Sequence, residues 1–256
     1  MKKKFISFEE TKRFSKLIRS YLNQSPELKP FYGFDPSIDN FEKQIELKKE
    51  FYAASHRDVL VNTLEEQYSA VALSAAVEQN LNLLKKENTF TITTGHQLSL
   101  MTGPIYFLYK IISTINLCKH LEKAYPKSNF IPVYWMASED HDFEEISSFR
   151  FENKNVVWPL KAAGAVGDMP LEDLQPTLDT FEQQLGGSVN ADFLKNLIDR
   201  SYRVSKSLSE ATFRLVNFLF GDYGLLVLEP QKNELKALFK PVLKEELLKS
   251  SSYLEV

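Results

Sequence analysis

Two polar segments carry the side chains that could do chemistry, and each directly follows an apolar run. In the first, Thr93–Pro104, a glycine lets the backbone approach a ligand closely, and the start of a helix would add free N–H groups. Such groups bind the oxygens of a phosphoryl or carboxylate group. The residues that we expect to line this site are Thr93, Thr94, Gly95, His96, Gln97, Thr102, Gly103 and Lys110.

His96 is the candidate catalytic residue of this segment, because an imidazole can donate a hydrogen bond to an oxyanion as its charge develops. A plainer interpretation stays open, since a glycine turn between a strand and a helix is common without any site. Lys110 could reach a phosphate, or it could be a surface lysine whose apolar stem covers the helix.

The second segment, Ser138–Glu145, crowds carboxylates around the imidazole of His141. We expect this crowding to raise carboxyl and imidazole pKa values, which suits a general base or a divalent metal held by oxygen ligands. A solvated acidic loop is the alternative, but the position directly after the most apolar run of the chain favours a site. The candidate catalytic residues are Asp140, His141 and Asp142, and the candidate substrate contacts are Ser138, Glu139 and Glu229.

Four other residues invite a functional interpretation that their surroundings do not favour. Cys118 lies on the apolar stripe of a predicted helix, so packing is its expected role. His56 and His120 have no polar constellation around them, and we expect both at the surface. Trp135 lies within an apolar run and is expected in the core rather than as a stacking platform.

Three short apolar runs predict the strands that position the two polar segments. They are Phe90–Thr93, Phe130–Ala137 and Gly224–Pro230, and the residues from Gly103 to about Tyr125 have the spacing of a buried helix. Strand, helix, strand is the connection of a parallel sheet, so the polar residues that follow the strands should meet at one edge. Pro132 must then lie where no hydrogen bond between strands is needed.

The elements before and between these strands divide the chain. Residues 1–88 predict a helical segment that packs on the core, and Ser7 with Glu10 matches a capping box. Residues 89–256 predict the first part of an α/β core with an inserted segment at about 146–222. The expected elements are a helix to about Leu22, a loop over 23–40, two or three helices over 41–86 broken near 54–55 and 72–74, a hairpin of 146–151 with 156–160, and helices at about 170–184, 190–202, 207–220 and 233–249.

The composition excludes several classes of protein. The net charge is −3, and basic and acidic residues are mixed, so no footprint for nucleic acid is present. No secretory signal is predicted, and no apolar stretch reaches the roughly 20 residues that a membrane span needs. The single cysteine fits a reducing compartment, and we expect a cytoplasmic protein without membrane contact.

The chain resembles the bacillithiol biosynthesis cysteine-adding enzyme family, a family of cysteine ligases. Two motifs carry the resemblance, TTGHQLSLMTGPIYFLYKIIS and FIPVYWMASEDHDFEEI, together with Gly224–Pro230 and the helix that contains Leu238–Pro241. The resemblance implies a Rossmann-like core related to class I nucleotidyltransferases, and a helical coiled coil that forms a homodimer. Residues Thr93–His96 then match the T/H-x-G-H loop that handles phosphates in nucleotidyltransferases.

The same resemblance implies the reaction. Cysteine would be joined through its carboxyl group to the amine of glucosaminyl-malate, in the last step of bacillithiol synthesis, with ATP or another nucleotide as activator and Mg²⁺ as a possible companion. Many relatives carry glutamine at the position of His96, which favours an oxygen-binding role for the loop. Family members are also much longer, so we expect this chain to be truncated, an N-terminal half of such a protein.

Two other functions stay open at this point. The Glu139–Glu145 cluster could hold a divalent metal for phosphoester hydrolysis, although we assign no set of metal ligands. Alternatively, the chain could be a non-catalytic module for nucleotide binding or dimerisation.

Overall fold

The computed structural model describes residues 4–160 and 162–255, and it forms two compact units divided in the chain between Phe51 and Tyr52. The sequence predicted a boundary at residue 88 instead, with the helical segment before it packing on the core. Two helices of that segment belong with the sheet, because α5 contacts its strands and α4 packs on α5. The bounds of the helices over 41–86 are α3 (Phe41–Phe51), α4 (Ala54–Tyr68) and α5 (Ala75–Leu84), which confirms three helices there.

The N-terminal helix is shorter than predicted. The capping box is confirmed, since Ser7 and Glu10 cap each other's backbone N–H groups at the start of α1 (Phe8–Thr11). A single helix to Leu22 is wrong, however, because Lys12 takes a left-handed conformation with φ of 53°. Ser15 then caps a second helix, α2 (Lys16–Leu22), by accepting a hydrogen bond from the N–H of Ile18.

The described chain contains the predicted parallel sheet. Its strands are β1 (Thr89–His96), β2 (Asn129–Met136) and β5 (Leu226–Leu228), in the order β1-β2-β5, and α6 (Tyr106–Ala124) connects β1 to β2. Pro132 lies one residue before the pairing of β2 with β5 begins at Val133, so its missing N–H costs no bond to β5.

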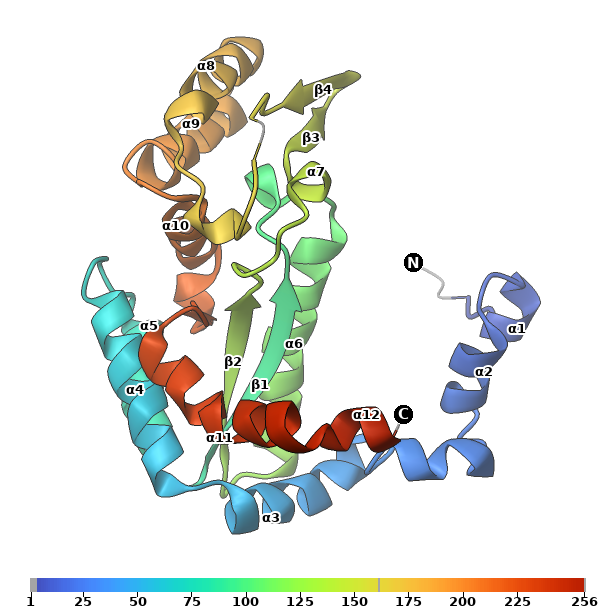
Figure 1. Cartoon of the computed structure of the whole chain (residues 1–256). Coiled ribbons are helices and arrows are strands. Elements are labelled where there is room, and N and C mark those ends of the chain that lie inside the picture. The colour runs from blue at the N-terminus through green and yellow to red at the C-terminus, as the bar shows by residue number, and fades with distance from the viewer. Residues whose placement is uncertain (1–3, 161, 256) are drawn as a thin grey trace. The chain divides into compact units, whose positions relative to one another are not determined.

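The two faces of the sheet are covered unequally. Figure 1 shows α6 on one side of the strands and α4 and α5 on the other. Under α6 lie His96 and Tyr134, whose rings both contact Phe107. On the opposite face Ile131 is fully buried, but Trp135 is 47% exposed.

The expectation of a core Trp135 is therefore wrong. Side chains alternate along a strand, so Trp135 shares its face with Thr93 and Gly95 of the neighbouring edge strand. Both of those residues are exposed as well, because no described helix covers this corner of the sheet. The sequence pattern could not reveal this, since an apolar run looks the same whether or not a helix covers its last residue.

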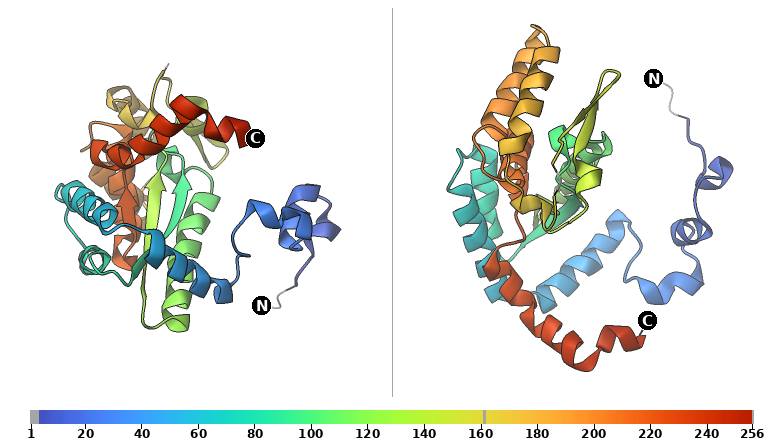
Figure 2. Two further views of the ribbon diagram at one scale, coloured as in Figure 1. Left: turned by 60° about the horizontal axis from the view of Figure 1, so that its bottom comes forward. Right: turned by 45° about the horizontal axis from the view of Figure 1, so that its top comes forward.

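The inserted segment extends beyond the carboxyl ends of the strands (Figure 1). It contains the predicted antiparallel hairpin, in which a tight turn at Glu152-Asn153 joins β3 (Ser148–Phe151) to β4 (Lys154–Val157). Figure 2 shows two of its helices, α8 and α9, side by side. The α-helices and strands between β2 and β5 are α7 (Phe143–Ile146), β3 (Ser148–Phe151), β4 (Lys154–Val157), α8 (Gln175–Gln184), α9 (Val189–Ser201) and α10 (Leu208–Phe220). The helices after β5 are α11 (Asn233–Lys249) and α12 (Ser251–Glu255). Within the described ranges, no helix has both the length and the apolar character that crossing a bilayer requires.

Candidate functional site

The polar residues that follow the three parallel strands meet at one edge of the sheet, as the strand order predicts. Gln97, after β1, donates its side-chain N–H groups to Asp140 (3.2 Å) and to Glu145 (2.5 Å), which follow β2. Ser138, also after β2, donates its hydroxyl to Glu229 after β5. The predicted convergence of the loops is thus confirmed.

His96 is 8% exposed and lies beneath the first turn of α6. Its Nδ1 is 3.0 Å from the carbonyl oxygen of Gln97, so Nδ1 is the nitrogen that carries a proton. Nε2 has no hydrogen bond to any described residue. The neutral ring can therefore only accept a proton at Nε2, whereas the protonated ring can donate from Nε2 to an anion.

The beginning of α6 is open to a ligand. No side chain caps it, and the backbone N–H groups of Tyr106 and Leu108 have no partner in the described part of the chain. Unpaired N–H groups and the helix dipole attract anions. The imidazole of His96 lies against this turn, with ring centroids 5.3 Å from Tyr106 and 5.2 Å from Phe107.

Lys110 adds a positive charge here. Its Nζ donates to the carbonyl oxygen of Gly95 at 3.2 Å, and the side chain is exposed. Thr94 and His96 share the face of the sheet under α6, but Thr93 lies on the opposite face. The structure therefore does not bring the side chain of Thr93 to the same place as the imidazole.

Thr102 and Gly103 shape the path of the chain into α6. Met101, Thr102 and Gly103 all have positive φ, of 49°, 72° and 57°. Gly103 also has ψ of −128°, and a Cβ there would lie 2.5 Å from Cβ of Ser99, so glycine is required. The N–H of Met101 donates to the hydroxyl of Tyr202 at 2.9 Å.

Asp140 organises the second loop. One of its oxygens accepts the N–H groups of His141 (2.7 Å) and Asp142 (3.0 Å), while the other accepts from Gln97. The N–H of Asp142, helped by the other donors, holds the pKa of Asp140 below its usual value. The expected rise is therefore wrong for this carboxyl, because the donors stabilise its charged form more than burial disfavours it.

The other members of the cluster have different tasks. Asp142 caps α7 by accepting the N–H of Glu145 at 3.2 Å. Glu139 forms an ion pair with Lys236 of α11. The ring of His141 is exposed and makes no hydrogen bond with a described residue, which leaves it available to a ligand.

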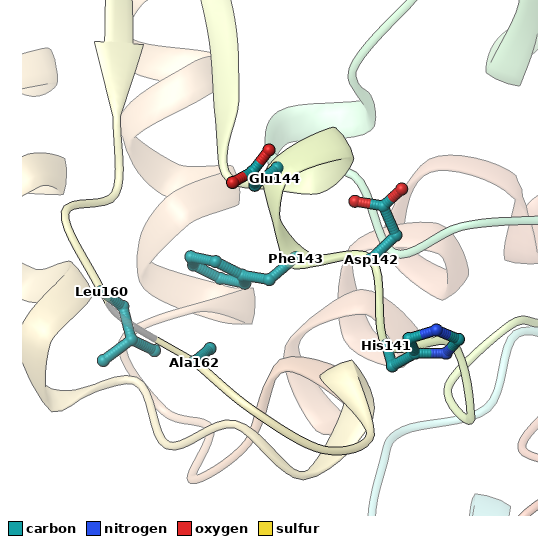
Figure 3. A pocket seen from close by; sticks show the side chains of 6 residues that line it. All are labelled: His141, Asp142, Phe143, Glu144, Leu160 and Ala162. Atoms are coloured by element: carbon teal, nitrogen blue, oxygen red, sulfur yellow. The ribbon is translucent and has the colours of Figure 1, made fainter.

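An open pocket of about 570 Å³ adjoins His141. Figure 3 shows Phe143 pointing toward Leu160 and Ala162, while His141 and Asp142 extend in other directions. The lining residues are His141, Asp142, Phe143, Glu144, Leu160 and Ala162. Polar groups thus border one part of the pocket and apolar groups the other.

Glu229 is held by several donors. Its carboxylate accepts the hydroxyls of Ser138 and Ser209 and the N–H of Gln231 at 2.9 Å. Burial raises the pKa of Glu229, although the Ser138 hydroxyl and the Gln231 N–H partly oppose the rise. The contacts of Glu229 and Ser138 tie the loops together inside the protein, so neither side chain is free for a ligand.

Sequence reasoning missed the residues that the inserted segment contributes. Gly167 packs on Ser138 so closely that a Cβ would lie 2.6 Å from Cβ of Ser138, and its N–H donates to the Ser138 carbonyl at 2.9 Å. The N–H of Val166 donates to the carbonyl of Asp140 at 2.7 Å. The only sequence signal was the pair of glycines in the stretch AAGAVGD, which by itself indicates a turn.

The remaining candidates behave as expected. Cys118 is buried on α6, and burial raises its pKa to about 12, so packing is confirmed. His56 and His120 are exposed.

Among the described residues, no three His, Cys, Asp or Glu side chains are arranged to hold a metal ion.

Comparison with known proteins agrees with the resemblance of the two motifs. A family model described as "Bacillithiol biosynthesis BshC, N-terminal Rossmann-like domain" matches residues 1–256. The chain is 50% identical over 248 residues to a protein of Flavobacterium johnsoniae, covering 97% of this chain and 47% of the relative. It is 44% identical over 252 residues to one of Christiangramia forsetii, with 97% and 47% covered.

A more distant relative from Bacillus anthracis is 29% identical over 251 residues, with 94% of this chain and 45% of the relative covered. All three relatives carry the name "Putative cysteine ligase BshC". The chain thus spans about half the length of the curated relatives that it matches.

Proposed function

Since the chain belongs to the BshC family of bacillithiol biosynthesis and matches its N-terminal Rossmann-like domain, we propose that the protein containing it is a ligase that adds cysteine to glucosaminyl-malate. The amide would form between the carboxyl group of cysteine and the amine of the second substrate. The observation that supports this most strongly is the meeting of an anion-binding helix start with an acidic loop at one sheet edge.

The start of α6 fits the phosphates of an activating nucleotide such as ATP, with Mg²⁺ as its companion. The free N–H groups of Tyr106 and Leu108 and the charge of Lys110 all favour phosphate oxygens. A bound nucleotide would supply a leaving group to the cysteine carboxylate, because a carboxylate does not acylate an amine unaided. His96, when protonated, donates from Nε2 to an oxygen on which negative charge develops.

The acidic loop fits the amine substrate. Asp140 stays ionised because its pKa is lowered, so it attracts an ammonium group but is a poor proton acceptor. His141 has a free ring and is the group that we assign as the base that deprotonates the amine. Asp142 adds negative charge beside it while capping α7.

The direct test is product formation by the complete protein with cysteine, glucosaminyl-malate and MgATP, followed by mass spectrometry. We expect the double variant His141→Gln, Asp142→Asn to lose about 100-fold or more in kcat, because a positioned general base contributes on that scale. Asparagine caps helices about as well as aspartate, so α7 should persist. The matched control is His120→Gln, on the exposed side of α6.

The outcomes separate the alternatives. Full activity of the double variant would contradict the roles of His141 and Asp142. Nucleotide binding without product would contradict the ligase and indicate a non-catalytic binding module. We also propose that the complete protein is a homodimer, and sedimentation of a monomer at micromolar concentration would contradict that.

A further inference from the structure

Backbone strain is concentrated in the short loop that leads into α6. Met101 and Thr102 are non-glycine residues with φ of 49° and 72°, a conformation that L residues adopt at an energetic cost. The loop is anchored on both sides, because Leu100 and Phe107 are each only 1% exposed. Any freedom of the backbone is therefore confined to the residues between them.

Tyr202 holds this loop from the inserted segment. The tyrosine follows directly after α9, is fully buried, and accepts the N–H of Met101 at 2.9 Å. Burial raises the pKa of Tyr202 to about 12, so the hydroxyl stays neutral over the physiological pH range. This bond links the strained loop to the helical part of the insertion.

The loop in turn sets the direction of the first turn of α6. Gly103 lies two residues before the N-cap residue Ile105, and the unpaired N–H groups follow immediately. If the loop relaxed from its left-handed path, these N–H groups would lose their common direction. A phosphate site that depends on preorganised donors loses affinity when its donors must be ordered on binding.

We propose that Tyr202 is a positioning residue for nucleotide binding, which acts by holding Met101–Gly103 in the left-handed path that aims the start of α6 at the phosphates. The proposal rests on the proposed function, which places the activating nucleotide there. The inserted segment thereby helps to form the site, although Tyr202 itself does not touch the nucleotide.

The test compares Tyr202→Phe with Tyr68→Phe in the complete protein. Tyr68 is a matched control, because it is also buried and its hydroxyl accepts a backbone N–H, that of Val227, at 2.8 Å. Each variant loses one bond of the same kind, so both should lose similar thermal stability. Only Tyr202→Phe should bind MgADP more weakly, by about 3- to 10-fold, as expected for one hydrogen bond.

Kinetics and hydrogen exchange supply the readouts that a merely structural role would not move. In Tyr202→Phe we expect a raised KM for ATP with an unchanged KM for cysteine, and faster amide exchange over residues 101–106. If both variants bind MgADP like the wild type, the role of Tyr202 is overturned while the proposed function stands. If the wild type itself binds neither MgADP nor MgATP, the nucleotide site fails and this proposal fails with it.

Discussion

The side-chain nitrogen of Gln97 lies 3.2 Å from a carboxylate oxygen of Asp140, and this bond joins the loop after β1 to the loop after β2. The same nitrogen also donates to Glu145 at 2.5 Å. One neutral amide group therefore separates two carboxylates that would otherwise repel each other. The two loops that carry most of the candidate site residues are held together by this side chain.

Replacing Gln97 by methionine should weaken both the fold and the activity. The change keeps the length of the side chain but removes the donor shared by Asp140 and Glu145. Hydrogen bonds to charged groups contribute about 1.5–3 kcal/mol, and partial exposure reduces this, so we expect a loss of about 1 kcal/mol in the free energy of unfolding. Urea denaturation measures it, with the exposed Gln79→Met as control. Equal stability of the two variants would contradict the bridging role.

Gly167→Ala should displace the loop after β2. The added Cβ would meet Cβ of Ser138 at 2.6 Å and its carbonyl oxygen at 2.9 Å, so the two backbones must move apart. Such overpacking costs about 1–3 kcal/mol. Gly187→Ala is the matched control, because nothing lies within 4 Å of a Cβ there. Thermal unfolding measures the stability of both variants. A Gly167→Ala variant as stable as Gly187→Ala would show that the insertion does not pack tightly against this loop.

The ionisation of Glu229 should lower the free energy of unfolding as the pH rises above the usual pKa of a glutamate. Burial raises the pKa of Glu229 above 4.5 in the folded chain. Between 4.5 and the raised value the folded state binds more protons than the unfolded state, so the free energy of unfolding decreases with increasing pH. The stability of the wild type relative to Glu229→Gln should therefore decline across this window.

Denaturant unfolding at several pH values between 4 and 7 measures that decline. Glu144→Gln, at an exposed position, is the matched control for the loss of one carboxylate. A wild-type free energy of unfolding that rises with pH relative to that of Glu229→Gln would contradict the direction of the shift.

Cys118 should resist alkylation in the native protein. Burial raises its pKa from 9.0 to about 12, which lowers the thiolate fraction near pH 8 by about a thousandfold, and the thiolate is the reactive species. Iodoacetamide labelling followed by peptide mapping should find Cys118 unmodified in the native state and modified in urea. Rapid labelling without unfolding would reopen a role for this thiol as a nucleophile.

The local sequence pattern was sufficient to predict the strands of the sheet, the helix that connects them and the loops at the edge of the sheet. The apolar runs of β1, β2 and β5 and the spacing of α6 follow from burial of regular secondary structure, and strand, helix, strand implies parallel pairing. Parallel pairing then brings Gln97, Asp140 and Glu229 to one edge without further information. Most of the candidate residues could therefore be predicted from the sequence alone.

The protonation and availability of those residues depend on partners that lie far away in the chain. The pKa of Asp140 is lowered rather than raised because the N–H of Asp142 donates to it, together with the side chain of Gln97, 43 residues earlier, and the N–H of His141. Trp135 is exposed because no helix of the described chain reaches its corner of the sheet, and Tyr202 reaches Met101 across 101 residues. Sequence alone determined which groups gather at the sheet edge, since strand order is a local consequence of connectivity. Which of them are free to act was decided by tertiary contacts, because hydrogen bonds and burial between distant segments leave no periodic trace in the chain.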